Sequence, residues 1–161
     1  MEKIINISTG EMAVGSDNSI IRTVGIGSCI VIAFYDEENR VGAMSHSLLP
    51  TRKKTKNPKI FPDKTKKSAK YVDEVIELMI DEIVAMGGKK ENLKAKLVGG
   101  AKMFKILSGD KHGIGYRNIE AANQKLAVLG VPIESEATGG TVGRMAELNL
   151  GNGVLNIETK M

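Results

Sequence analysis

The sequence lacks residues on which several classes of protein depend. It has no tryptophan, and aromatic residues make up only 4% of its 161 residues. Its single cysteine, Cys29, allows no internal disulfide, which suits a reducing compartment. No stretch approaches the roughly 18 consecutive apolar residues of a membrane-spanning helix, and the first residues show no cleavage signature. These absences predict a soluble, cytoplasmic protein that does not insert into membranes.

The glycine-rich segments also lack the residues that bind nucleotides. Residues 25–27 read Gly-Ile-Gly, but they have no third glycine and precede a predicted strand. Residues 139–144 read Gly-Gly-Thr-Val-Gly-Arg and have no Walker lysine. Metal binding needs several convergent ligands, whereas the chain has two histidines, and His112 stands in a predicted exposed loop without a nearby cysteine. We therefore expect no cofactor and no metal.

Basic residues are concentrated in one segment. Residues 52–70 carry nine lysines and arginines against one acid, Asp63, which gives the segment a net charge of +8 and leaves the rest of the chain at −4. Such a segment either contacts an acidic partner or nucleic acid, or it is a solvated loop. Only Phe61 and Tyr71 could stack on bases nearby, which disfavours nucleic acid as a partner. An acidic protein surface and solvent remain as alternatives.

Hydrophobic periodicity predicts a single α/β domain over residues 1–161, dominated by strands and with two main helices. Apolar residues between 68 and 86 recur at spacings of three and four, which predicts a helix that ends at Gly87 and Gly88. A second helix is expected over 118–129, with Asn118 as its N-cap. Residues 145–150 and 154–158 predict a terminal hairpin.

The residues best suited to catalysis lie in or directly before one predicted hairpin. Cys29 precedes this hairpin and His46 stands near its end, within a β-branched and aromatic pattern at 30–47 that has an acidic turn. A turn centred between residues 37 and 38 pairs Cys29 with His46 and brings their Cβ atoms to about 5 Å. The imidazole could then take the thiol proton and return it to a leaving amine. The Thr23 hydroxyl is a candidate to hold the other ring nitrogen.

The residues before the cysteine favour the same chemistry. Gly27 and Ser28 leave backbone N–H groups uncrowded, as an oxyanion hole requires. A lone cysteine is equally compatible with a small buried hydrophobic residue, and a lone histidine with a surface or core position. Spacing alone leaves both interpretations open.

Six groups of residues add a further signal. They are Thr23 with Gly27-Ser28-Cys29 and His46, SLLP at 47–50, YVD at 71–73, GGAKMF at 99–104, IGYRN at 114–118, and TGGTVGR at 138–144. In this order they closely resemble the CheD family of chemoreceptor glutamine deamidases. Ser45 departs from the family pattern, in which asparagine is more frequent, and so removes a possible supporting hydrogen bond.

The resemblance implies a layered sandwich in which helices cover mixed β-sheets. It implies that Cys29, His46 and Thr23 deamidate glutamine to glutamate on the helices of methyl-accepting chemoreceptors, in chemotaxis signalling. It also implies a CheC-type phosphatase as a partner, and Met103 and Phe104 are candidates for that contact. The alternative is a non-catalytic binding module that regulates such a phosphatase.

Overall fold

The computed structural model describes residues 2–52, 68–103 and 113–160. The strands are β1 (Lys3–Asn6), β2 (Met12–Ser16), β3 (Ser19–Ile26), β4 (Ile30–Asp36), β5 (Val41–Ser47), β6 (Leu93–Gly99), β7 (Ile133–Thr138), β8 (Gly143–Asn149) and β9 (Leu155–Lys160). The helices are α1 (Val72–Ala85), the short 3-10 helix η1 (Lys90–Asn92) and α2 (Gly113–Leu129). No helix within these ranges is long and apolar enough to cross a membrane.

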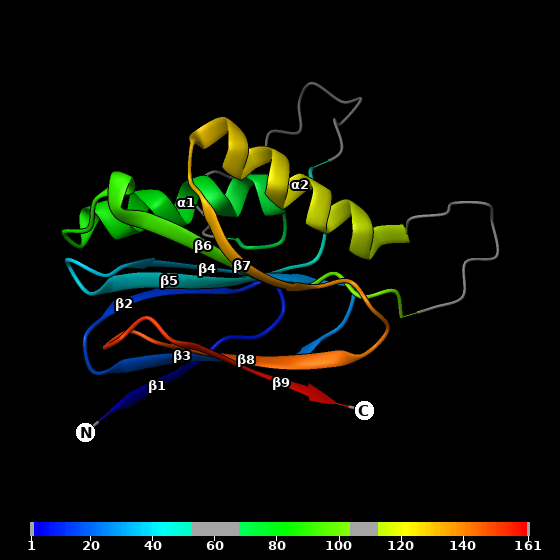
Figure 1. Cartoon of the computed structure of the whole chain (residues 1–161), viewed down its shortest axis with the longest axis horizontal. Helices are drawn as coiled ribbons and strands as arrows, with labels where there is room; N and C mark the ends of the chain where they lie inside the picture. The colour runs from blue at the N-terminus through cyan, green and yellow to red at the C-terminus, as the bar shows by residue number, and fades with distance from the viewer. Residues whose placement is uncertain (1, 53–67, 104–112, 161) are drawn as a thin grey trace.

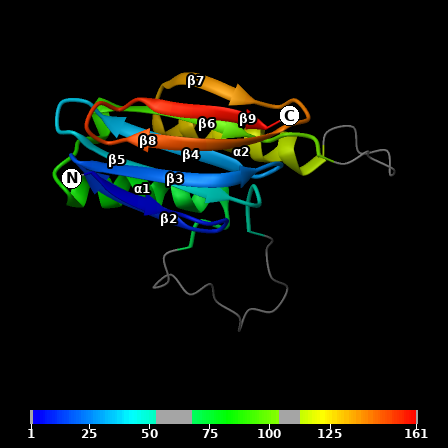
Figure 2. The same ribbon diagram turned by 90° about the horizontal axis from the view of Figure 1, so that it is seen from below.

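The elements form three layers. Five strands in the order β2-β5-β4-β6-β7 make the central sheet, and four in the order β1-β3-β8-β9 make the outer sheet. The two helices cover one face of the central sheet, and the outer sheet covers its other face (Figure 1). Figure 2 views the molecule from the side of the outer sheet. Each sheet combines one parallel pair with antiparallel pairs. The predicted α/β sandwich of mixed sheets with two main helices is confirmed.

The strand β4 runs through the middle of the molecule because both of its faces are apolar. Ile30, Ile32 and Phe34 belong to the core between the central sheet and the helices. Val31 and Ala33 belong to the core between the two sheets. A strand covered on both faces carries a nearly continuous apolar run rather than an alternating one. This position packs the start of β4, which directly follows Cys29, between the helices and the outer sheet.

The helix predictions are confirmed in part. The α1 stripe is buried at Val72, Ile76, Met79 and Ile83, as its spacing predicts, whereas Met86 is 44% exposed and lies beyond the last turn. The α2 helix begins five residues earlier than predicted, at Gly113, so the side chain of its buried Asn118 lies inside the helix and does not cap it. The terminal hairpin is present as the antiparallel pair β8 and β9.

The predicted register of the β4–β5 hairpin is wrong by two residues. Asp36 pairs with Val41 and Val31 pairs with His46, so the connection is residues 37–40. The Asp36 carboxylate accepts hydrogen bonds from the backbone N–H and the side-chain amide of Asn39, at 3.0 and 2.8 Å, which lengthens the turn. Successive residues of a strand face opposite sides, so an even shift leaves every side chain on its predicted face.

Candidate active site

Cys29 ends a short turn between β3 and β4, residues 27–29, which we call the Cys29 turn. Before it, β3 leaves its regular pairing with β8 between Thr23 and Ile26. Gly25 in this interval has a φ of 69°, a left-handed value that glycine adopts without steric cost. The irregular pairing redirects the chain from the outer sheet to the central sheet. Cys29, which is half-buried, therefore lies where the two sheets meet.

Every carbonyl of the Cys29 turn accepts a hydrogen bond from elsewhere in the chain. The Ala101 N–H donates to the Gly27 carbonyl at 3.0 Å, and the Gly100 N–H donates to the Cys29 carbonyl at 2.8 Å. The Ser28 carbonyl accepts from a side chain of α2 at 3.0 Å. In a trans peptide, the C=O of one residue and the N–H of the next point in opposite directions. The N–H groups of Ser28 and Cys29 therefore point away from these donors.

His46 and Thr23 meet across the space between the two sheets. His46 stands on β5 of the central sheet and Thr23 on β3 of the outer sheet, and both are buried. Thr23 Oγ1 lies 2.7 Å from His46 Nδ1. The other ring nitrogen, Nε2, is buried and has no hydrogen-bond partner among the described residues. The Thr23 hydroxyl thus orients the ring through one nitrogen and leaves the second one available.

Extrapolated strand alternation predicts that Cys29 shares a face with His46. Val31 is opposite His46 and belongs to the core between the sheets. Continuing the alternation by one residue beyond β4 puts Cys29 on that face. Cys29 is then a diagonal neighbour of His46, at on the order of 7 Å rather than the 5 Å of a directly opposed pair. The predicted direct pairing of Cys29 with His46 is therefore wrong because the turn is longer, and their common face stays a prediction.

Burial shifts both titrating groups toward their neutral forms. Removal from water lowers the pKa of His46 below its ordinary value. Removal from water also raises the pKa of the Cys29 thiol, and a hydrogen bond from its own backbone N–H offsets part of this rise. A neutral thiol and a neutral imidazole are therefore the resting pair at neutral pH, rather than a thiolate and an imidazolium.

Comparison with known proteins places this chain in a family. Residues 48–159 match the family model for CheD, which is described as chemotactic sensory transduction. The chain belongs to the CheD family. It is 39% identical over 158 residues to a probable chemoreceptor glutamine deamidase, CheD 2, of Geobacter metallireducens, covering 98% of this chain and 94% of that protein. It is 36% identical over 160 residues to the chemoreceptor glutamine deamidase CheD of Halalkalibacterium halodurans, covering 99% and 95%. It is 37% identical over 155 residues to that of Thermotoga maritima, covering 96% and 90%.

The predicted resemblance to CheD is thereby confirmed. The residue at which this CheD-family chain departs from the expected pattern, Ser45, is buried on β5 beside His46. Its hydroxyl has no hydrogen-bond partner in the part of the chain that the structure describes. The Ser45 side chain therefore supplies no support to the Thr23–His46 pair, as the sequence indicates.

One of the two predicted partner-contact residues lies beside the Cys29 turn. Met103 is 43% exposed, and its Cγ would be 3.2 Å from a Cβ atom added to Gly27. Its side chain therefore covers this glycine of the CheD site while remaining open to solvent. Phe104 lies outside the described residues, as do His112 and residues 53–67 of the basic segment. The described start of that segment, Arg52, forms an exposed ion pair with Glu74 at 3.0 Å.

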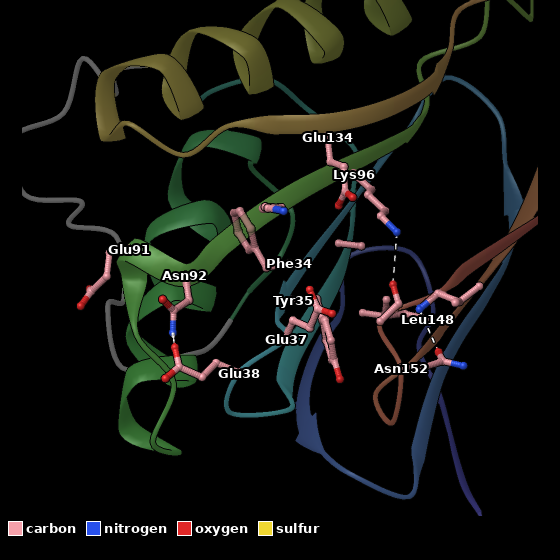
Figure 3. A pocket seen from close by; sticks show the side chains of 14 residues that line it. Phe34, Tyr35, Glu37, Glu38, Glu91, Asn92, Lys96, Glu134, Leu148 and Asn152 are labelled. Carbon is pink, nitrogen blue, oxygen red and sulfur yellow. Dashed lines mark hydrogen bonds between the residues drawn. The ribbon is translucent and has the colours of Figure 1, made fainter.

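A cavity of about 640 Å³ lies at the other end of β4 and is distinct from the candidate site. Figure 3 shows its lining, which includes Tyr35, Glu38 and Glu134. The Lys96 ammonium in this lining donates to the carbonyl of Gly153 at 3.2 Å. The lining contains no cysteine or histidine. Among the described residues, no group of three or more histidine, cysteine and acidic side chains could hold a metal ion.

Sequence reasoning missed one polar residue that contacts the candidate site. Asn118 supplies the α2 side chain that contacts the Cys29 turn, although the sequence suggested a helix cap. The sequence does contain a signal that Asn118 is buried, because it precedes the buried Ala122 by four residues and the buried Leu126 by eight. A polar residue on the apolar face of a helix usually has a specific buried partner.

Proposed function

We propose that this CheD-family chain is a cysteine-dependent chemoreceptor glutamine deamidase with Cys29, His46 and Thr23 as its active site. The observation that carries the proposal is the buried Thr23–His46 contact of 2.7 Å, which leaves His46 Nε2 without a partner. An imidazole held by a third group through one nitrogen is the usual form of a general base that activates a nucleophile. Strand alternation, continued one residue beyond β4, supports a position of the proposed nucleophile, Cys29, on the same face.

The first half of the reaction makes a thioester. His46 Nε2 takes the proton of the Cys29 thiol while the sulfur attacks the carboxamide carbon of a glutamine side chain. The carbonyl oxygen becomes an oxyanion, which the N–H groups of Ser28 and Cys29 stabilise. The C–N bond then breaks, and the proton on Nε2 goes to the leaving nitrogen, so that ammonia departs. His46 returns to its neutral form.

The second half releases glutamate. His46 Nε2 takes a proton from water, whose oxygen attacks the thioester carbon through a second oxyanion in the same place. The C–S bond breaks, and the proton returns to sulfur. One water molecule is consumed and one ammonia released for each glutamine, and the thiol is restored. The lowered pKa of His46 fits this cycle, because the ring must be neutral at the start of each half.

The proposed substrates are glutamines on chemoreceptor helices. The names of the relatives in Halalkalibacterium halodurans and Thermotoga maritima give chemoreceptor glutamine as the target of those proteins. We expect the protein to act in the cytoplasm, where the helices of receptor signalling regions lie. The exposed Met103 supports a contact with a CheC-type phosphatase near the site. If that contact were the whole function, the chain would be a binding module without catalytic activity.

The test is incubation with a receptor cytoplasmic fragment, followed by mass spectrometry of its peptides and an assay for ammonia. We expect glutamine to become glutamate with the wild-type protein, and no conversion with Cys29→Ala or His46→Gln. The matched control is His112→Gln, which changes the only other histidine and should retain activity. Conversion that persists in Cys29→Ala would reject the mechanism, and retained amides with wild type would favour the binding module.

A further inference from the structure

The side chain of Asn118 joins two parts of the molecule that are far apart in sequence. It is completely buried, and its Nδ2 group donates to the Ser28 carbonyl and to the Leu48 carbonyl, each at 3.0 Å. Both hydrogens of the amide are therefore used. The orientation of the amide is settled by these contacts, because the reverse orientation would direct its oxygen at two carbonyl oxygens.

Glycines bring α2 close enough for this contact. A Cβ atom on Gly115 would lie 2.6 Å from the carbonyl oxygens of Gly100 and Ala101, which is closer than real Cβ atoms approach. A Cβ atom on Gly100 would overlap the side chain of Ile119. The first turn of α2 thus lies directly on the backbone of residues 100–101. That backbone in turn supplies the two N–H donors to the Cys29 turn.

The two carbonyls that Asn118 binds belong to the strand ends that carry the thiol and the imidazole. The Ser28 carbonyl shares its peptide unit with the Cys29 N–H, and Leu48 directly follows β5, the strand of His46. A hydrogen bond to the carbonyl fixes the plane of that peptide and polarises its N–H, which strengthens the N–H as a donor. One amide therefore sets the direction of the Cys29 N–H and ties the start of β4 to the end of β5.

The free-energy cost of burying the Asn118 side chain argues against a purely structural role for this residue. The Oδ1 atom of Asn118 is buried and has no hydrogen-bond partner among the described residues. Most buried polar atoms in folded proteins are paired, so an unpaired one needs an explanation. Violations of local folding rules concentrate at functional sites. An apolar residue would complete the buried face that Ala122 and Leu126 form on α2, but it could not bind either carbonyl.

We infer that Asn118 is a positioning residue of the deamidation site, which holds the Cys29 peptide in the orientation that stabilises the oxyanion. This inference rests on the proposed function. Asn118 should stabilise the transition state and not the bound substrate, because the oxyanion forms only in the transition state. Removal of the amide should therefore lower kcat and leave KM almost unchanged.

The test compares Asn118→Leu and Asn118→Asp with the same changes at Asn123. Asn123 lies on the same helix, and its Nδ2 group donates at 2.9 Å to the Ile119 carbonyl within that helix. With a glutamine-containing receptor fragment as substrate, we expect kcat to fall about 10- to 100-fold for both Asn118 variants, with KM within about twofold. The Asn123 variants should keep both constants within about twofold. Thermal melts give the folded fraction, by which each rate is divided.

A second measurement separates this inference from the proposed function. The rate of Cys29 alkylation by iodoacetamide is followed against pH for wild type, Asn118→Leu and Asn123→Leu. The Cys29 N–H also contacts its own sulfur, so a displaced peptide should move the alkylation profile of Asn118→Leu to higher pH. If wild type releases no ammonia, the proposed function fails, and the alkylation profile alone decides on Asn118. The inference would be overturned if the folded fraction of Asn118→Leu had the kcat of wild type, or if its alkylation profile were the same as that of wild type.

Discussion

Replacement of Thr23 by valine tests how much the orientation of His46 contributes to catalysis. Valine has the shape of threonine and lacks the hydroxyl, so it removes the 2.7 Å contact with His46 Nδ1 and little else. For His46 Nε2 to accept a proton, Nδ1 must carry its own hydrogen and donate it to Thr23. Without Thr23 Oγ1, the ring loses this preference and can adopt the tautomer that carries its hydrogen on Nε2, which cannot accept the thiol proton.

The expected magnitude follows from burial and charge. Both residues are buried, with Thr23 only 2% exposed, so water does not replace the lost partner. During attack the ring becomes an imidazolium, and a hydrogen bond to a charged group contributes about 1.5–3 kcal/mol. Since about 1.4 kcal/mol corresponds to a tenfold change in rate, kcat should fall roughly 10- to 150-fold.

The assay is the rate of ammonia release from a receptor fragment at saturating concentration, measured for wild type, Thr23→Val and Thr23→Ser. Serine keeps the hydroxyl and removes only a methyl group, so Thr23→Ser should retain most of the activity. The reasoning is refuted if Thr23→Val keeps kcat within about twofold of wild type. It is equally refuted if serine lowers kcat as far as valine, because the methyl packing would then be responsible.

Three further predictions concern the thiol, the imidazole and the contact of Gly99 with the Cys29 turn. Because burial raises the pKa of Cys29, its alkylation rate should still be rising above pH of about 8.5, the ordinary thiol value; a plateau near neutral pH would contradict this. Because burial lowers the pKa of His46, the unfolded chain binds a proton at higher pH than the folded one. The free energy of unfolding should therefore fall as pH decreases below about 6.5, and less so in His46→Gln, as urea titrations at several pH values would show. Gly99→Ala should lower the free energy of unfolding by more than the about 1–3 kcal/mol of backbone strain alone. Gly99 has a φ of 112°, and a Cβ atom there would also overlap the Cys29 carbonyl. Gly87→Ala, with a φ of 98° and no atom within 4 Å, is the control, and an equal loss in both variants would exclude the overlap as the cause.

Local patterns predicted the elements of this fold well where one face of an element is buried. The α1 stripe follows from side-chain period, because burial against a core selects one face. The terminal hairpin follows from the turn residues Gly151, Asn152 and Gly153. The hairpin pattern also predicts a common face for the thiol and the imidazole. The register was wrong because the length of the turn depends on the contacts of the Asp36 carboxylate with Asn39, which the hydrophobic pattern does not encode.

Contacts between distant segments could not be predicted from spacing. Asn118 and Ser28 are separated by 90 residues, and their contact depends on how α2 lies against Gly100. The same limit applies to the cavity at the far end of β4, whose lining comes from strands and loops throughout the chain. The candidate thiol, imidazole and hydroxyl follow from residue type and order, and their catalytic role stays a prediction, whereas the groups that hold them in place required the structure.

The Thr23–His46 contact links the two sheets through one buried ring. Threonine comes from one layer and histidine from the other, and the side chains between them, such as Ile21 and Met44, set the spacing of the layers. A change in the volume of either would shift one layer against the other and stretch the contact. Substitutions of these interior side chains would then alter the basicity of the imidazole without contacting it. The reactivity of His46 would therefore depend on how the two sheets are aligned.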